Sequence, residues 1–145
     1  MAFGYVTYKN FAPVNSIASD LTDSEGCGLK LDGEGEVSLA VTTGSVPYAI
    51  VAVGATSITG SYPGAPIAGS LEVIDQLGVA VQVRASDAGS IAAGDYIQID
   101  SSASVPGSFT ANNAPTAGDF VWGMALTDCS ADEQFILRFA PFIAA

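Results

Sequence analysis

The chain has 145 residues, of which 49% are apolar and 13% are charged, and this is enough apolar material to bury a core in one domain. Fifteen acidic residues against four basic ones give a formal net charge of −11, which repels phosphate backbones and argues against a nucleic-acid partner. The apolar residues form short runs broken by small or polar residues, so no window predicts a membrane-spanning helix. The N-terminal sequence MAFGYVTYKNF also lacks the basic region and apolar stretch of an export signal, so we expect neither such export nor a membrane partner.

The chain contains no histidine, which excludes Ser-His-Asp and Cys-His catalysis and the common zinc ligand sets. A mechanism with two carboxylates, as in glycosidases, remains formally open, but the sequence does not pair any two acids. No P-loop or dinucleotide-binding glycine motif is present. We therefore predict a non-enzymatic protein that uses no cofactor.

The first half of the chain predicts strands separated by long loops. Residues 3–8 form a first strand or an extended arm, and the polar residues 15–28 form a loop, in which residues 20–25 cap a short helical turn. The remaining elements of this half are an alternating strand at 36–42, a buried strand at 48–53 and a loop rich in Gly and Pro at 60–69.

The second half predicts a more regular series of strands. A long loop of small and polar residues at 101–118 contains one short strand near 105–109. Ala93-Gly94-Asp95-Tyr96-Ile97 is echoed by Ala117-Gly118-Asp119-Phe120-Val121, and in both segments Gly-Asp predicts a tight turn that opens a strand. The five further strands are expected at 71–74, 79–84, 96–99, 120–126 and 134–139.

These elements predict an all-β protein, either a small β-sandwich or a β-tulip or β-clip-like barrel, with an extended N-terminal arm and long loops. We assign residues 1–36 to an N-terminal arm or strand plus an acidic loop, and residues 37–145 to a single β domain.

Four aromatic residues near the N-terminus are the candidate partner-binding residues. Phe3, Tyr5, Tyr8 and Phe11 are interleaved with Lys9 as the one charge. If the segment is an edge strand of the domain, these rings belong to the core. If it is an arm, it binds a partner by strand addition, with the aromatic rings as anchors. Both interpretations remain open.

The acidic residues Asp32, Glu34 and Glu36 alternate along the chain, so in an extended strand their carboxylates point to one side. Calcium binds oxygen ligands of this kind, but the EF-hand pattern is missing. A solvated loop face is therefore the favoured interpretation, and no metal site is assigned. Cys27 and Cys129 match no metal or redox spacing, and we favour two free thiols over a disulfide.

Several elements of the C-terminal half follow one another in a recognisable order. A valine-rich strand at 79–83 is followed by Ile91-Ala92-Ala93-Gly94-Asp95, by a loop rich in Ser, Ala and Thr, by Trp122-Gly123-Met124-Ala125-Leu126-Thr127-Asp128 and by a last strand at 135–139. Over residues 76–139 this order resembles the capsid decoration, or cement (head-stabilising), proteins of tailed bacteriophages. Residues 130–133 depart from the family pattern, because they replace a glycine-containing turn, and residues 37–69 match no part of it.

The resemblance implies a small β-sandwich or β-tulip domain that forms a homotrimer on the outside of the expanded capsid. There it would staple neighbouring subunits of the major capsid protein, after assembly in the host cytoplasm. The resemblance thus implies a structural virion protein of the capsid exterior. Two alternatives remain open: another virion β module, such as a head fibre base, tail or adhesin component, or a small ligand-binding β-clip domain.

Overall fold

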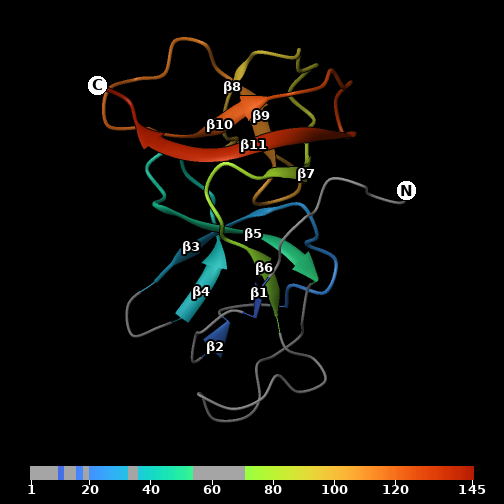
Figure 1. Ribbon diagram of the computed structural model, residues 1–145, viewed down its shortest axis with the longest axis vertical. Helices are drawn as coiled ribbons and strands as arrows, with labels where there is room; N and C mark the ends of the chain where they lie inside the picture. Colours follow the sequence, from blue (N-terminus) through green and yellow to red (C-terminus); the bar gives the residue numbers. More distant parts are fainter. Residues whose placement is uncertain (1–9, 12–15, 18–19, 33–35, 54–70) are drawn as a thin grey trace.

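The computed structural model describes residues 10–11, 16–17, 20–32, 36–53 and 71–145. Within these ranges the chain forms strands, turns and loops but no helix, and hence no helix that could cross a membrane. The prediction of an all-β fold is therefore confirmed. The strands form two open sheets, stacked as in a small β-sandwich, and among the described residues they do not close into a barrel (Figure 1).

Sheet A is the lower of the two sheets in Figure 1 and has six strands in the order β1-β6-β5-β3-β4-β2. Neighbouring strands are antiparallel, except that β2 pairs with β4 in parallel. The strands are β1 (Asn10–Phe11), β2 (Ser16–Ile17), β3 (Gly28–Leu31), β4 (Glu36–Leu39), β5 (Pro47–Val53) and β6 (Glu72–Ile74).

Sheet B is the upper sheet and has five antiparallel strands in the order β7-β11-β10-β8-β9. The strands predicted at 79–84, 96–99, 120–126 and 134–139 are present, with β11 four residues longer than expected. The short strand predicted near 105–109 lies instead at 109–111. The strands are β7 (Ala80–Arg84), β8 (Tyr96–Ile99), β9 (Phe109–Ala111), β10 (Phe120–Ala125) and β11 (Gln134–Ile143).

The strand β3 is not predicted by the sequence. Its residues, Gly-Leu-Lys-Leu, include no β-branched or aromatic side chain, and glycine is a weak strand former. Nevertheless β3 lies between β5 and β4, within the segment 1–36 that we assign to an arm and an acidic loop. The division of the chain at residue 36 stays a prediction, but residues 28–31 are interior to sheet A.

The main hydrophobic core lies between the two sheets. The alternation of β7 is confirmed, since Val81 and Val83 are buried in this core while Gln82 is only partly buried. At the core's centre the ring of Trp122 contacts Phe109 edge-on, with centroids 5.3 Å apart, and lies 6.2 Å from the ring of Phe139. Trp122 and both phenylalanines are at most 1% exposed.

Both faces of β5 are buried, which explains why its sequence is almost continuously apolar. Ile50 belongs to the core between the sheets. Its neighbours Ala49 and Val51 belong to a second cluster on the opposite side of the strand, together with Leu21, Leu29, Val37, Leu71 and Val73. Sheet A therefore separates two hydrophobic cores.

The two echoing Gly-Asp segments adopt the same turn, as predicted. Asp95 N–H donates to the carbonyl of Ala92 at 3.1 Å, and Asp119 N–H donates to that of Thr116 at 3.0 Å. The glycine before each aspartate has a φ of +95° (Gly94) or +93°, as the third position of a type II turn requires. Each turn leads directly into a strand of sheet B, β8 and β10.

The predicted helical turn at residues 20–25 is wrong. The carboxylate of Asp20 accepts the N–H of Thr22 at 2.8 Å, and Ser24 N–H donates to the carbonyl of Leu21 at 3.1 Å. Aspartate often stabilises a turn in this way, by replacing a backbone acceptor with its own side chain. Residues 20–27 thus form consecutive tight turns and no helix.

Candidate protein-binding surface

The predicted aromatic anchors lie almost entirely outside the described residues. This applies to Phe3, Tyr5 and Tyr8. Phe11 lies in β1, where its backbone is in register with Glu72 of β6 at one edge of sheet A. Whether these four rings bind a partner therefore stays a prediction.

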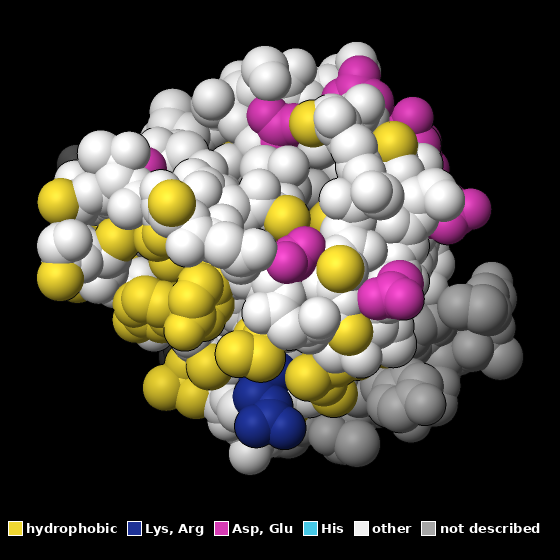
Figure 2. Space-filling view, turned by 90° about the horizontal axis from the view of Figure 1, so that it is seen from above, with side chains coloured by type: hydrophobic (Ala, Val, Ile, Leu, Met, Phe, Trp, Pro, Cys, Tyr) yellow, Lys and Arg dark blue, Asp and Glu magenta, His cyan; other side chains and the backbone are white. Residues whose placement is uncertain are grey.

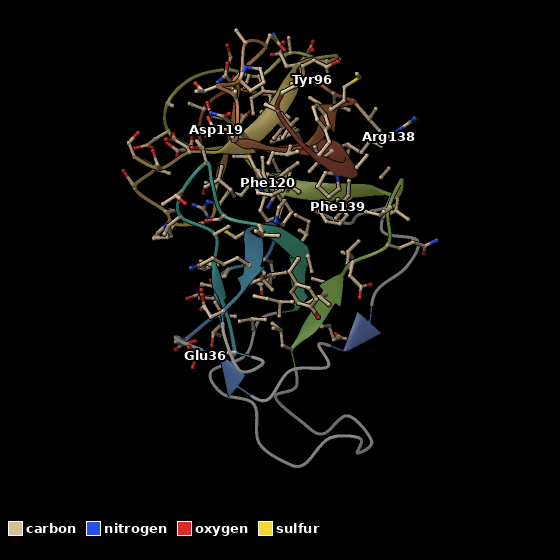
Figure 3. All side chains as sticks on the ribbon, turned by 90° about the vertical axis from the view of Figure 1, so that its left-hand side faces the viewer. Glu36, Tyr96, Asp119, Phe120, Arg138 and Phe139 are labelled. Carbon is tan, nitrogen blue, oxygen red and sulfur yellow. The ribbon has the colours of Figure 1, made fainter. Side chains whose placement is uncertain are left out.

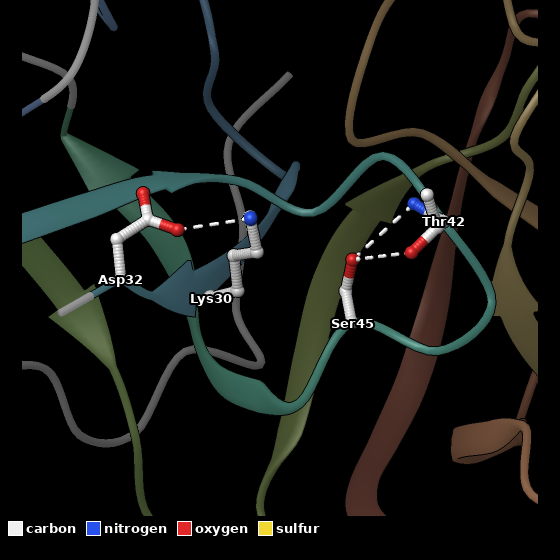
Figure 4. A network of polar contacts seen from close by, with 4 residues as sticks. All are labelled: Lys30, Asp32, Thr42 and Ser45. Carbon is white, nitrogen blue, oxygen red and sulfur yellow. Dashed lines mark hydrogen bonds and ion pairs between the residues drawn. The ribbon is translucent and has the colours of Figure 1, made fainter.

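The acidic segment is partly described, and the charge of Asp32 is compensated by a neighbouring lysine. Asp32 forms an ion pair with Lys30 at 2.9 Å (Figure 4), and its N–H donates to the carbonyl of Glu36 at 2.7 Å. A hydrogen bond from Ser38 and the nearby Lys30 ammonium lower the pKa of Asp32. Glu34 lies outside the described residues, among which no three acidic or cysteine side chains gather as a metal ion would require.

The loop that joins β4 to β5, which lie on either side of β3 in sheet A, is stabilised by a second set of polar contacts (Figure 4). Thr42 donates its N–H to the hydroxyl oxygen of Ser45 at 3.2 Å, and the two hydroxyl groups lie 3.1 Å apart. The hydroxyl of Thr43 donates to Asp119, in the turn that precedes β10, at 2.8 Å. The contacts of Thr43 hold the loop against the other sheet.

The two cysteines are free, as predicted. Cys27 is buried, and this burial raises the pKa of its thiol to about 11. Burial also raises the pKa of Cys129. Because the thiolate is the reactive form of cysteine, neither residue has the low pKa of a nucleophile.

The two segments that carry the resemblance, residues 91–95 and 122–128, are hydrogen-bonded to each other. Gly94 N–H donates to the carbonyl of Ala125 at 2.8 Å, and Ala125 N–H donates to that of Asp95 at 2.9 Å. Gly94 and Asp95 on one side thus lie opposite the single residue Ala125, and this arrangement is a glycine-containing β-bulge. The carboxylate of Asp128 also accepts the N–H of Ala93 at 2.7 Å. The positive φ of Gly94, +95°, explains why glycine suits this position of the bulge, and Ala125 opposite it is buried.

Asp95 stabilises this turn with its side chain. Its carboxylate accepts the N–H of Ala92 at 2.9 Å and the side-chain amide of Asn113 at 2.8 Å. The amide oxygen of Asn113 in turn accepts the N–H of Tyr96 at 2.8 Å. The bond from Asn113 is the main cause of the lowered pKa of Asp95, followed by the backbone bond.

We expect Asp95→Ala to lower the free energy of unfolding by about 1 kcal/mol, because the N–H of Ala92 and the amide of Asn113 lose their acceptor at a partly exposed site. A lowered pKa stabilises the folded state above the ordinary value of 3.8, and this contribution is lost as the pH falls through the lower, folded-state pKa. In urea unfolding, the difference in the free energy of unfolding between the wild type and Asp95→Ala should therefore be smaller at pH 3 than at pH 7.

The exposed Asp23 provides the matched control, since Asp23→Ala should change stability by less than about 0.5 kcal/mol at both pH values. An Asp95→Ala protein as stable as the wild type at pH 7 would show that the carboxylate does not hold the turn.

The outward face of sheet B is the candidate binding surface. Tyr96, Met124, Arg138 and Ala80 lie side by side across β8, β10, β11 and β7. The residues next to them on each strand, such as Ile97 and Leu137, are buried in the core, so this row faces away from sheet A. Figure 3 shows Tyr96 and Arg138 on the side of sheet B that is remote from sheet A.

This outer row is rich in exposed apolar surface. Tyr96 and Met124 are each 39% exposed, and Phe142 is 45% exposed. The rings of Tyr96 and Phe142 meet edge to face, with centroids 5.8 Å apart. Figure 2, which looks down on this face, shows hydrophobic side chains gathered on one side around a basic side chain, with acidic side chains on the other side.

This surface is not among the predictions made from the sequence. The alternation of the strands predicts the core, and the predicted partner-binding residues are the N-terminal aromatic residues. The outward-facing positions of the same alternating strands could have revealed this surface, because Tyr96, Met124 and Phe142 are large apolar residues at such positions.

Comparisons of this chain with protein-family models and with curated proteins find no significant match.

Proposed function

We propose that this protein is a structural virion protein that binds the outer surface of a bacteriophage capsid and stabilises the lattice of the major capsid protein. It acts as a homotrimer on the exterior of the virion and catalyses no reaction. The proposal begins from the resemblance over residues 76–139 described above.

One structural observation supports this proposal most directly. The two segments with the family pattern, residues 91–95 and 122–128, are far apart in the chain yet form one hydrogen-bonded unit at the end of sheet B. Their glycines, alanines and aspartates satisfy backbone groups, so the pattern is explained by a turn that supports the fold. A structural domain of this kind suits a protein whose task is binding.

The proposed mechanism is mass action. A protein that binds only the expanded lattice stabilises that lattice, by about 4 kcal/mol per site when its free concentration is 1,000 times the dissociation constant. If the three copies of a trimer contact several capsid subunits at once, avidity increases the effect without any additional chemistry. Stabilisation of this kind would oppose the pressure of packaged DNA.

The test uses the gene's neighbourhood to identify the major capsid protein, whose shells are then prepared in the compact and the expanded form. We expect the purified protein to sediment with expanded shells, to raise their melting temperature in calorimetry, and to bind compact shells much more weakly. In the absence of shells, ultracentrifugation should give the mass of a trimer.

Bovine serum albumin at equal mass concentration controls for non-specific co-sedimentation and for crowding. If expanded shells neither retain the protein nor melt at a higher temperature in its presence, the proposed function is wrong.

A further inference from the structure

Charge is distributed unevenly over this acidic protein. None of its fifteen acidic residues lies in the five strands of sheet B, and all of them fall in loops, turns or the first half of the chain. Sheet B instead contains the two arginines, Arg84 and Arg138. A chain with a net charge of −11 thus has one broad face without carboxylates in its strands.

Arg138 lies in the middle of the outer row, in register with Met124 on one side and Ala80 on the other. Its side chain is exposed and makes no ion pair with another described residue. Methionine, aromatic residues and arginine are enriched in the centres of protein interfaces. The outer row therefore combines apolar contact area with one cation that forms no ion pair within the described part of the chain.

The same row is not complementary to itself. A two-fold contact between two copies centred on this row would place positive Arg138 against apolar residues or a second Arg138, because the row itself contains no carboxylate. A partner that complements the row has an apolar surface with an acidic side chain opposite the guanidinium.

We propose that the outer face of sheet B is the surface that contacts the capsid lattice, where an apolar patch of the major capsid protein carries a carboxylate opposite Arg138. This inference rests on the proposed function and adds the contacting surface and the chemistry of its partner. The carboxylate would pair with the guanidinium, and Tyr96, Met124 and Phe142 would supply the buried apolar contact around it.

The test compares four variants for binding to expanded shells. We expect Arg138→Glu and Phe142→Asp to weaken binding at least about 100-fold, because each puts a carboxylate into the contact. Arg138→Lys should stay within about 10-fold of the wild type, because it keeps the charge but loses bidentate geometry. The matched control is Leu31→Asp, which introduces the same charge at a residue of sheet A that is 51% exposed, and it should bind as the wild type does.

Circular dichroism and ultracentrifugation of each variant show whether it is folded and what its oligomeric mass is. If all the sheet B variants bind expanded shells as tightly as the wild type does, this inference is overturned and the proposed function is unaffected. A change of oligomeric mass in Arg138→Glu and Phe142→Asp would instead assign this face to contacts between copies, which also overturns the inference. If the wild type itself does not bind expanded shells, the proposed function and this inference both fail.

Discussion

Replacement of Trp122 by alanine is expected to lower the free energy of unfolding by about 4 kcal/mol, a large part of the 5–15 kcal/mol by which small domains are stable. The indole is fully buried and packs between the rings of Phe109 and Phe139. A Cβ atom added at Gly28 would lie only 2.9 Å from it, so the indole also reaches β3 of sheet A. Its removal would leave a cavity where the two sheets meet.

Urea unfolding followed by far-UV circular dichroism measures this loss, and Met124→Ala on the same strand is the matched control. Met124 is exposed on the opposite face, so its truncation should cost less than about 0.5 kcal/mol. Trp122→Phe adds information, since the indole N–H has no hydrogen-bond partner among the described residues and its loss removes a buried unsatisfied donor. A loss below about 1 kcal/mol for Trp122→Ala would mean that the sheets are not held together at this point.

Gly123→Ala is expected to lower the free energy of unfolding by at least about 3 kcal/mol. Gly123 has a φ of +152°, which side chains with a Cβ rarely adopt, and it follows the register shift between β10 and β11. An added Cβ would lie 1.9 Å from the carbonyl oxygen of Arg138. Because this obstacle is backbone of the neighbouring strand, the two strands would have to separate.

Two other glycines distinguish the causes of this effect. Gly94→Ala tests positive φ alone, since its φ is +95° and nothing lies within 4 Å of the added Cβ, so we expect a loss of about 1–2 kcal/mol. Gly89→Ala involves neither a positive φ nor a collision, because its φ is ordinary and its added Cβ meets open space. It should leave the free energy of unfolding nearly unchanged. Equal unfolding midpoints for Gly123→Ala and Gly94→Ala would refute the backbone collision.

Gly123 also gives a physical reason for part of the sequence pattern Gly-Met-Ala-Leu at residues 123–126. The glycine accommodates the carbonyl of Arg138, and Ala125 is a small, buried residue opposite the bulge at Gly94. Met124, between them, faces outward. The pattern therefore combines two requirements of the fold with one position free to serve a binding surface.

The alternation of apolar and polar residues was sufficient to predict most of the strands, because the period of two is a local property of an extended chain. This alternation located β7, β8 and β10 within one or two residues. The repeated Gly-Asp turns were predicted from their residue types alone. The absence of histidine and of catalytic motifs likewise needed no structure to be recognised.

Only the tertiary structure decided which strands are neighbours and which outward positions form one surface. β3 has weak strand propensity and is held in place by hydrogen bonds to β4 and β5, which are distant contacts that no local pattern contains. Tyr96, Met124 and Arg138 are separated in the chain and become adjacent through the register of three strands. The sequence by itself determined an acidic, all-β chain without the residues for common catalysis, whereas the pairing of the strands determined where its exposed apolar row lies.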